Sequence, residues 1–382
     1  MKINGFYLFL LIFLISMLVA MIFPSLRYIR YFLPILPVIM FSEYKRKLAV
    51  DKSIINYFLT FLIFYLFVIS YLLIVNLIKW DISQRFFPNA VFILAPLTFI
   101  LFILPFFNPD KIGLYIKTMF FMSVLIYLSE VGFSITDVVS TIQALATAHM
   151  PSEVATESEL GFVFGFFVLY FFLKGNSKWY LVMSLLFFVI SFKRIVIVGV
   201  VISLVVYLIL KIFRIDIRRH KLKLTLMALV VNLTIIYGAQ LLVSGTFDQH
   251  VLEYTGLSSD AFLLGRKTFY TEVFEKFGSY NLVGLGLGKV DDALFNFLGY
   301  SMNLHSELIK NYLEFGLIIF LVWMSLLIYK NLFSNKSVVF LIYFNLLIVT
   351  DNIFIYFHGM FYFYFFVLIL LVEEQKCTYA TQ

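Results

Sequence analysis

Charge and cysteine are both scarce in this sequence of 382 residues. Charged residues make up only 13% of it and hydrophobic residues 62%, whereas soluble domains are about 25% charged and about 45–50% apolar. A chain of this composition cannot cover its surface with polar groups in water. The single cysteine, Cys377, excludes an intramolecular disulfide and a cysteine metal cluster. These absences exclude a soluble globular domain and predict an all-α polytopic membrane protein.

The net charge of +7 does not indicate nucleic acid binding, because most Lys and Arg residues occupy short linkers between apolar runs. In that position they orient membrane spans. A spanning helix needs about 20 apolar residues, and the first run, which lacks a small-residue cleavage site, is predicted to be a retained span. The breaks between runs predict twelve spans, near residues 6–23, 31–42, 54–78, 88–107, 112–130, 160–173, 179–192, 195–210, 224–243, 306–329, 338–356 and 359–372.

The distribution of positive charge predicts the orientation of these spans. With both termini in the cytoplasm, the inner segments hold 17 Lys and Arg residues and the outer segments 10, as the positive-inside rule requires. This orientation puts two long loops, 131–159 and 244–305, on the outer face of a single transmembrane domain, 1–382. The loop 131–159 contains no Lys or Arg, and it is either a solvated lid or part of an acceptor-side cleft.

A basic pair, Lys193 and Arg194, separates two apolar runs. The first run has only about 14 residues and is shorter than the roughly 30 Å hydrocarbon core. The pair is therefore predicted to lie at or slightly below the outer membrane surface. There it either faces a phosphate group or extends to lipid headgroups.

Arg266 lies in a predicted amphipathic helix over residues 261–277, with Asp260 as N-cap and Gly278 as stop. The apolar stripe of this helix, which includes the position of Arg266, is formed by Phe262, Phe269, Val273 and Phe277. An arginine on that face either binds a phosphate through two parallel hydrogen bonds or forms a salt bridge with Glu272 or Asp260.

Three alternating glycines, Gly284, Gly286 and Gly288, follow in the same loop. A nucleotide fingerprint needs a strand before the glycines and a helix after them, and no such unit is predicted here. The glycines therefore either form a plain turn or offer backbone amides to an anion.

His305 precedes the tenth predicted span and is expected in the first turn of its helix. A neutral histidine there either accepts a proton from a sugar hydroxyl or caps the helix and packs against the loop. The opposite face of this helix carries polar residues, which predict a polar cavity: Glu307, Lys310, Asn311 and Glu314. A further polar group at the end of the eleventh span consists of Asp351, Asn352 and His358.

Taken together, these segments resemble the O-antigen polymerase and ligase superfamily of bacterial membrane glycosyltransferases. The resemblance rests on Gly265-Arg266, on the alternating glycines, on Asn303-Leu-His305-Ser306 with Glu314 and Gly316, and on the earlier Ser191-Phe-Lys193-Arg194. The motifs extend from Ser191 to Gly316. The sequence departs from the family pattern in having His305-Ser306 where the family has a histidine-asparagine pair.

This resemblance implies a GT-C-like membrane fold and an O-antigen or exopolysaccharide polymerase of the bacterial inner membrane. The enzyme would join oligosaccharide repeat units linked to undecaprenyl pyrophosphate, with membrane lipid and a chain-length regulator protein as further partners. It would need no cofactor and no metal. Arg266 and His305 would be catalytic, and the substrate-binding residues would be Lys193, Arg194, Lys267, Tyr270, Asn303, Glu314 and Asp351. The alternatives are an O-antigen ligase acting on lipid A core and a lipid-linked oligosaccharide flippase.

Overall fold

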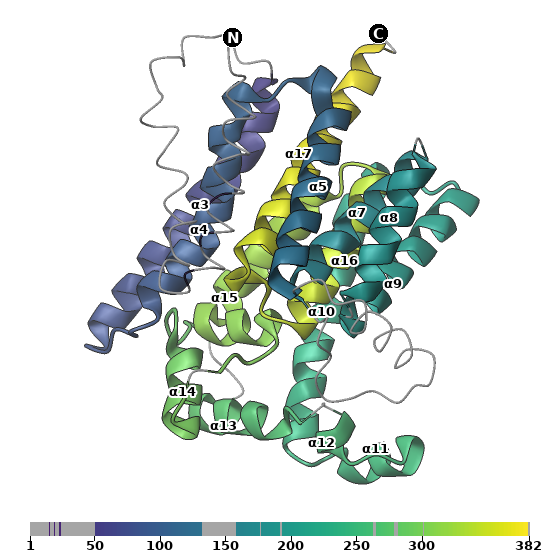
Figure 1. The fold of residues 1–382 in the computed structure, drawn as a ribbon. Coiled ribbons are helices and arrows are strands. Elements are labelled where there is room, and N and C mark those ends of the chain that lie inside the picture. Colours follow the sequence, from purple (N-terminus) through teal and green to yellow (C-terminus); the bar gives the residue numbers. More distant parts are fainter. Residues whose placement is uncertain are drawn as a thin grey trace.

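The computed structural model describes residues 50–131, 158–175, 177–191, 193–262, 265–278, 282–300 and 302–380, together with Ile15, Val19 and Phe23. This part of the chain is almost entirely helical and contains no strand (Figure 1). The prediction of an all-α protein is confirmed.

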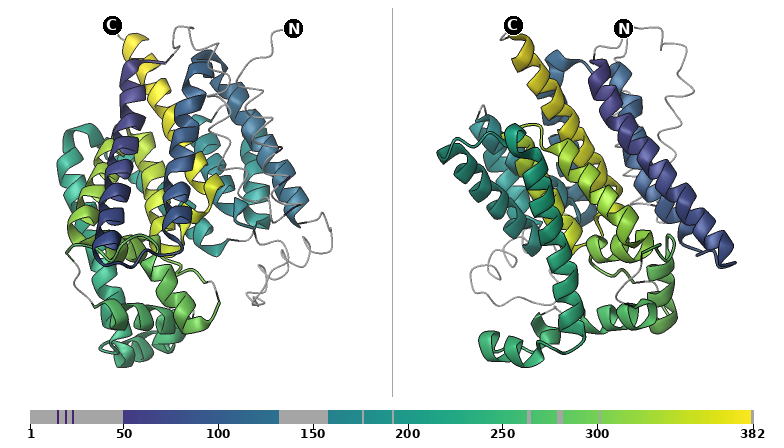
Figure 2. Two further views of the ribbon diagram at one scale, coloured as in Figure 1. Left: turned by 90° about the vertical axis from the view of Figure 1, so that its left-hand side faces the viewer. Right: turned by 180° about the vertical axis from the view of Figure 1, so that it is seen from behind.

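The helices form a bundle with a second, smaller layer across one end (Figures 1 and 2). The bundle contains α3 (Lys52–Ile78), α4 (Phe86–Ile103), α5 (Ile112–Val131), α7 (Leu160–Lys174), α8 (Lys178–Ile190), α9 (Arg194–Ile212), α10 (Lys221–Val243), α15 (Glu307–Asn331), α16 (Asn335–Thr350) and α17 (Phe357–Ala380). The end layer contains α11 (Asp248–Thr255), α12 (Ser259–Phe262), α13 (Lys267–Phe277) and α14 (Lys289–Leu298). Short 3-10 turns are η4 (Leu104–Phe106), η5 (Pro109–Lys111), η6 (Ile217–His220) and η7 (Ile353–Ile355).

Seven of the described helices are long and apolar enough to cross a membrane, and three further apolar helices, α7, α8 and α16, are shorter. The polytopic membrane character is thus supported, but the predicted count of twelve spans is not confirmed. The predicted span 31–42, most of the span 6–23 and most of the loop 131–159 lie outside the described residues. At about 1.5 Å per residue, the three shorter helices fall below the roughly 30 Å hydrocarbon thickness.

Helix α17 lies at the centre of the bundle. It is apolar on all sides and is buried from Phe357 to Leu370, as expected for a helix enclosed by other helices. It packs against α4, α7 and α16. Aromatic rings fill the contacts: Phe363 stacks on Phe344 with ring centroids 3.7 Å apart, and Phe366 stacks on Phe166 at 5.9 Å.

Buried hydroxyl groups within the bundle are hydrogen-bonded, which removes the cost of burying them. The indole nitrogen of Trp323 donates to the hydroxyl oxygen of Tyr65 at 3.1 Å. The Tyr343 hydroxyl donates to the carbonyl of Phe162 at 2.9 Å. These bonds fix how α3, α7, α15 and α16 pack together.

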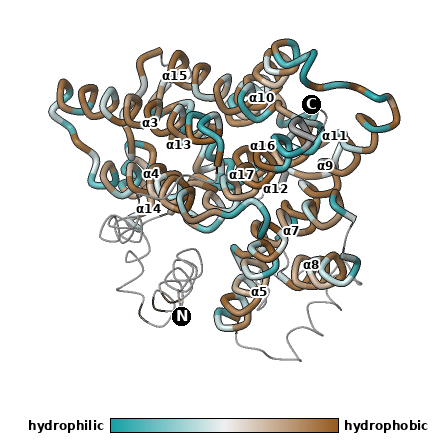
Figure 3. Tube along the Cα trace, turned by 90° about the horizontal axis from the view of Figure 1, so that it is seen from above, coloured by the Kyte–Doolittle hydropathy of each residue, from teal (hydrophilic) through white to brown (hydrophobic). Residues whose placement is uncertain are grey.

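The helices of the bundle consist mostly of hydrophobic residues, which are brown in Figure 3. On α9 and α10, large apolar side chains such as Val201 and Val230 are more than half exposed. Extended apolar surfaces of this kind on several helices are typical of contact with lipid.

Candidate functional site

Four predicted site residues lie at helix ends on the side of the bundle that carries the α11–α14 layer. Arg266 directly precedes α13, and Lys193 directly precedes α9. His305 lies just before α15, and Asp351 directly follows α16. We call these four residues the end cluster. Residues far apart in the sequence are thus brought to one end of an apolar bundle.

The prediction of one continuous helix over 261–277 is wrong, because the helical structure is interrupted at Gly265. Helix α12 ends at Phe262 and α13 begins at Lys267. Gly265 has a φ of 76°, a left-handed conformation that cannot continue a right-handed helix. Its N–H donates to the carbonyl of Asp260 at 2.8 Å. The break takes Arg266 out of the predicted apolar stripe and places it at the start of α13.

The remainder of that helix follows the prediction. Val273 is buried and Phe269 and Phe277 are half-buried, so α13 does present an apolar face. The helix ends at Gly278, which has a φ of 73°, as the stop signal predicted. The side chain of Phe262 lies outside the described residues.

Arg266 links two segments of the end cluster. Its Nη1 donates to the carbonyl of Thr350 at 3.1 Å and to that of His305 at 3.4 Å. These bonds join the last residue of α16 to the loop before α15. A guanidinium group has five N–H donors in a planar fork, so the same side chain can also bind an anion. Tyr270, one turn further along α13, is buried beside it.

His305 and Asp351 form the chemical centre of the end cluster. Nδ1 of His305 lies 3.7 Å from Oδ1 of Asp351, and the His305 side chain is 32% exposed while that of Asp351 is 8% exposed. His305 is therefore the more accessible member of the pair. With Nδ1 facing the carboxylate, Nε2 is the ring nitrogen available to a ligand.

The position of His305 differs from the prediction of a first helical turn. Helix α15 begins at Glu307, and Ser306 is its N-cap, accepting a hydrogen bond from the Ile309 N–H at 3.3 Å. His305 has a φ of 57°, which is uncommon for a residue with a side chain and costs backbone strain. The N–H of Glu307 donates to the carbonyl of Asp351 at 3.0 Å and holds the two segments together.

Asp351 is held in its ionised form. Burial opposes ionisation of this carboxyl, but the interaction with His305, the charge of Lys193 and the Asn352 N–H, which donates to Oδ1 at 2.8 Å, together lower its pKa below the usual value. Lys193 also lies over the ring of Phe162, with Nζ 5.6 Å from the centroid. The electrostatic effect on Asp351 relates the Lys193 ammonium group to the His305–Asp351 pair.

Replacing Asp351 by Asn is expected to lower stability at pH 7 by about 1–3 kcal/mol, because a buried charged hydrogen-bond acceptor is lost. A lowered carboxyl pKa stabilises the folded state above the unfolded pKa of about 3.9, and this contribution is lost as the pH falls through the lower folded value. The wild type should therefore lose stability in acid more steeply than Asp351→Asn. Thermal unfolding between about pH 3 and pH 7 measures both effects, with the exposed Asp260→Asn as control. Parallel curves for all three proteins would contradict the expectation.

The other predicted site residues lie elsewhere or make different contacts. Nζ of Lys267 lies 2.8 and 2.7 Å from the two carboxylate oxygens of Asp248, and this pair ties α13 to α11. Lys267 and the hydroxyl of Ser259 lower the pKa of Asp248. Arg194 is exposed at the start of α9, and Asn303 is half-buried in the loop before His305.

Two side chains beside the end cluster were not among the predicted site residues. Tyr356 precedes α17, and burial together with the charges of Asp351 and Glu159 raises its pKa well above the usual value. Glu159 directly precedes α7, and its Oε2 lies 3.9 Å from Nε2 of His358. The sequence feature that could have identified both residues is their position directly beside an apolar run.

The glycine run is a packing element rather than an anion cradle. Helix α15 contains a break at Gly316, which has φ 78° and ψ 162°. The N–H groups of Leu285 and Gly286 donate to the carbonyls of Leu313 and Glu314, both at 3.1 Å. The loop therefore satisfies carbonyl groups next to the break. A Cβ on Gly284 would lie 2.5 Å from the carbonyl oxygen of Glu314, so only glycine fits there.

Glu314 belongs to a second, buried polar group on α15. Its Oε1 accepts a hydrogen bond from the Val290 N–H at 3.2 Å. One helical turn earlier, Nζ of Lys310 lies 2.9 and 2.8 Å from the carboxylate oxygens of Asp291. Glu307 and Asn311 line the same small cavity. The predicted polar face of this helix exists, but α14 and α4 cover it.

The described side chains offer no set of ligands for a metal ion. In that part of the chain, no three His, Cys, Asp or Glu residues are placed to hold a metal ion. The end cluster itself offers an imidazole oriented by a carboxylate, together with an arginine and a lysine.

Comparison with known proteins does not support the predicted family. A family model described as the Frizzled/Smoothened family membrane region matches residues 78–197, less than a third of the chain. This is a different family from the O-antigen polymerase and ligase superfamily, so the predicted resemblance is wrong. The match ends before Arg266, His305 and Asp351. No curated protein and no solved structure matches the chain.

Proposed function

We propose that the protein is a membrane glycosyltransferase that polymerises glycan units carried on undecaprenyl pyrophosphate. The observation that supports this proposal is the His305–Asp351 pair beside Arg266, at one end of an apolar bundle. The chemistry of these residues supports transfer from a diphosphate-linked sugar, and the undecaprenyl carrier is part of the proposal.

The composition of the end cluster suits a lipid-linked diphosphate. Arginine binds phosphate oxygens through a planar fork of donors, and lysine supplies a second positive charge. Arg266 and Lys193 are the two cations of the end cluster. The exposed apolar faces of the bundle suit the polyprenyl chain, so one substrate would have its diphosphate at the bundle end and its tail in the bilayer.

The reaction would be a displacement at the anomeric carbon of the donor sugar. Nε2 of His305 would take the proton from an acceptor hydroxyl as its oxygen bonds to that carbon, while the bond from the carbon to the diphosphate oxygen breaks. Asp351 would orient the imidazole and stabilise its charged form. Arg266 and Lys193 would stabilise the negative charge of the leaving diphosphate.

The proposal includes a location and an orientation. The basic segment 211–223 would lie on the cytoplasmic side of a bacterial inner membrane, together with both termini. The end cluster and α11–α14 would then face outward, where lipid-linked repeat units are joined. A GT-C-like arrangement of the helices belongs to the same proposal.

Replacing His305 or Arg266 by Ala tests the proposal. Loss of a general base lowers a rate by about 10²–10⁴-fold, and loss of a charge-stabilising donor lowers it by about 10²–10³-fold. The purified protein in nanodiscs should extend an undecaprenyl-pyrophosphate-linked oligosaccharide into a ladder of products on a gel. The rate of chain extension should fall by these factors in the two variants, so that neither forms a visible ladder.

Lys276→Ala is the matched control, because it removes an exposed cation from the far end of the same helix α13. It should keep the wild-type ladder. In the native host, surface glycan reduced to core plus one unit supports the polymerase. Lipid-linked polymer that accumulates without attachment supports a ligase, and loss of glycan export without any loss of transfer supports a flippase. Normal ladders from both end-cluster variants would contradict the catalytic assignment.

A further inference from the structure

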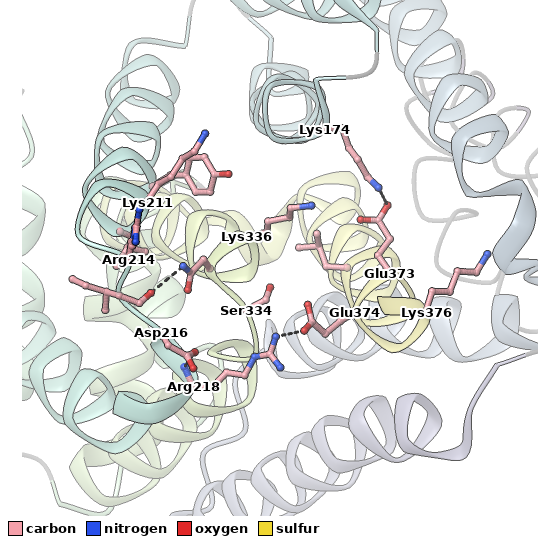
Figure 4. Close-up of a pocket in the computed structure, with 15 residues that line it drawn as sticks. Lys174, Lys211, Arg214, Asp216, Arg218, Ser334, Lys336, Glu373, Glu374 and Lys376 are labelled. Carbon is pink, nitrogen blue, oxygen red and sulfur yellow. Dashed lines mark hydrogen bonds and ion pairs between the residues drawn. The ribbon is translucent and has the colours of Figure 1, made fainter. Parts of the chain in front are cut away.

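A large cavity lies at the end of the bundle opposite the end cluster. Its volume is about 880 Å³, and its walls come from the ends of α7, α9 and α17, from the connection between α9 and α10, and from the start of α16 (Figure 4). We call it the basic basin. Ligand cavities have volumes of about 300–1,000 Å³, so the basin is large enough for a phospholipid headgroup.

The basin has an excess of positive charge. Six cations line it, Lys174, Lys211, Arg214, Arg218, Lys336 and Lys376, against three carboxylates, Asp216, Glu373 and Glu374. Each carboxylate already has a cationic partner. Glu373 pairs with Lys174 at 2.7 Å, Glu374 pairs with Arg218, and Asp216 pairs with Arg219 at 3.5 Å.

Three of the lining cations therefore lack a carboxylate partner among the described residues. They are Lys211, Arg214 and Lys336, whereas Lys376 pairs with Asp110 at 2.7 Å. Like charges that are gathered in one concavity repel one another and focus a positive potential there. A bound anion would relieve this repulsion.

The fold, and not charge pairing, holds these three cations together. Lys211 is in the last turn of α9, and Arg214 follows with a φ of 51°. Nδ2 of Asn335 donates to the carbonyl of Ile215 at 3.0 Å, which ties this turn to the first residue of α16. Lys336 is the next residue, so all three cations are placed by the same junction.

The start of α16 adds to the positive potential. Ser334 is its N-cap and lines the basin with Asn335. The N-terminus of a helix carries a partial positive charge, and its N–H groups favour phosphate. Topology signals alone would account for the number of cations at this end. They do not explain why cations from α9, from the α9–α10 connection and from the start of α16 line one cavity.

We propose that the basic basin binds a phosphate-bearing anion, supplied either by the headgroup of an anionic phospholipid or by a soluble phosphate compound. Lys211, Arg214 and Lys336 are the binding residues. This site is separate from the end cluster, so it stands whether or not the proposed transferase activity holds.

The test uses the full-length protein and two probes. Phosphatidylglycerol is titrated into phosphatidylcholine nanodiscs, and inorganic pyrophosphate is titrated into nanodiscs of phosphatidylcholine alone. Binding is followed by the rise in unfolding temperature, since a ligand of the folded state stabilises it. Replacing all three cations by Gln is expected to weaken binding at least about tenfold, because several charge-assisted bonds are lost together.

A control with the same change in charge separates a site from general attraction. Lys52, Lys178 and Lys223 are exposed and do not line the basin, and their triple Gln variant should bind as the wild type does. The single change Lys336→Gln should give a smaller loss, which keeps the test valid if the triple variant folds poorly. Basin-dependent binding of phosphatidylglycerol alone identifies a lipid headgroup, and binding of pyrophosphate identifies a soluble anion. Binding of neither, or equal losses in both triple variants, would overturn the proposal.

Discussion

Lys310→Met is expected to destabilise the protein by about 3–5 kcal/mol, the cost of leaving a buried carboxylate without its cation. The Lys310 side chain is 4% exposed and that of Asp291 12%. Asp291 also accepts a hydrogen bond from Asn89 at 2.8 Å, so it cannot turn away to solvent without breaking a second contact. Glu307 and Glu314 lie on the same helix face and are fully buried too. Unfolding in mixed micelles, followed by tryptophan fluorescence, measures the loss.

The double variant Asp291→Asn/Lys310→Met separates charge from packing. It removes both members of the pair, and replacing both partners is far less costly than removing one. Most of the lost stability should therefore return. If the double variant is as unstable as the sum of the single variants, the two side chains do not interact and the expectation fails.

Gly316→Ala is expected to cost about 3 kcal/mol or more, through overpacking together with backbone strain. A Cβ at this position would lie 2.3 Å from the backbone nitrogen of Gly284, and the φ of 78° disfavours any side chain. Relief would require moving the loop away from α15 and breaking its bonds to Leu313 and Glu314. The measurement is again unfolding in mixed micelles.

Gly238→Ala provides the comparison for Gly316→Ala. Gly238 lies within α10, and a Cβ there would meet nothing within 4 Å. Alanine favours a helix by about 1 kcal/mol over glycine, so this variant should be as stable as the wild type or slightly more so. Equal losses at both positions would show that the close approach at Gly316 does not matter.

Much of the fold was predictable because long apolar runs leave few alternatives. The runs at 54–78, 112–130 and 195–210 became α3, α5 and α9 with ends that differ by a few residues. The length of an apolar run did not settle the number of spans, since α7 and α16 are short and are covered by neighbouring helices. Length alone does not decide whether such a short helix counts as a span, whereas the equally enclosed α17 is long enough to be counted.

The candidate site was predictable as a set of residues but not as an arrangement. His305, Arg266 and Asp351 stood out because polar groups beside apolar runs are costly. The break at Gly265 is not visible in the sequence pattern, because the amphipathic stripe continues across it. The partnership of Arg266 with two carbonyl groups, from Thr350 and His305, depends on contacts across up to 84 residues. The motif order also indicated a family that comparison does not support, because each short motif is common by itself.

The central position of α17 has a consequence for how the chain is made. The ribosome completes this helix after α3, α4, α7 and α16, the helices against which it packs. Until then, the aromatic surfaces that will enclose it, including Phe166 and Phe344, have no partner from α17. The contacts that enclose α17 can therefore form only after these earlier helices have been made.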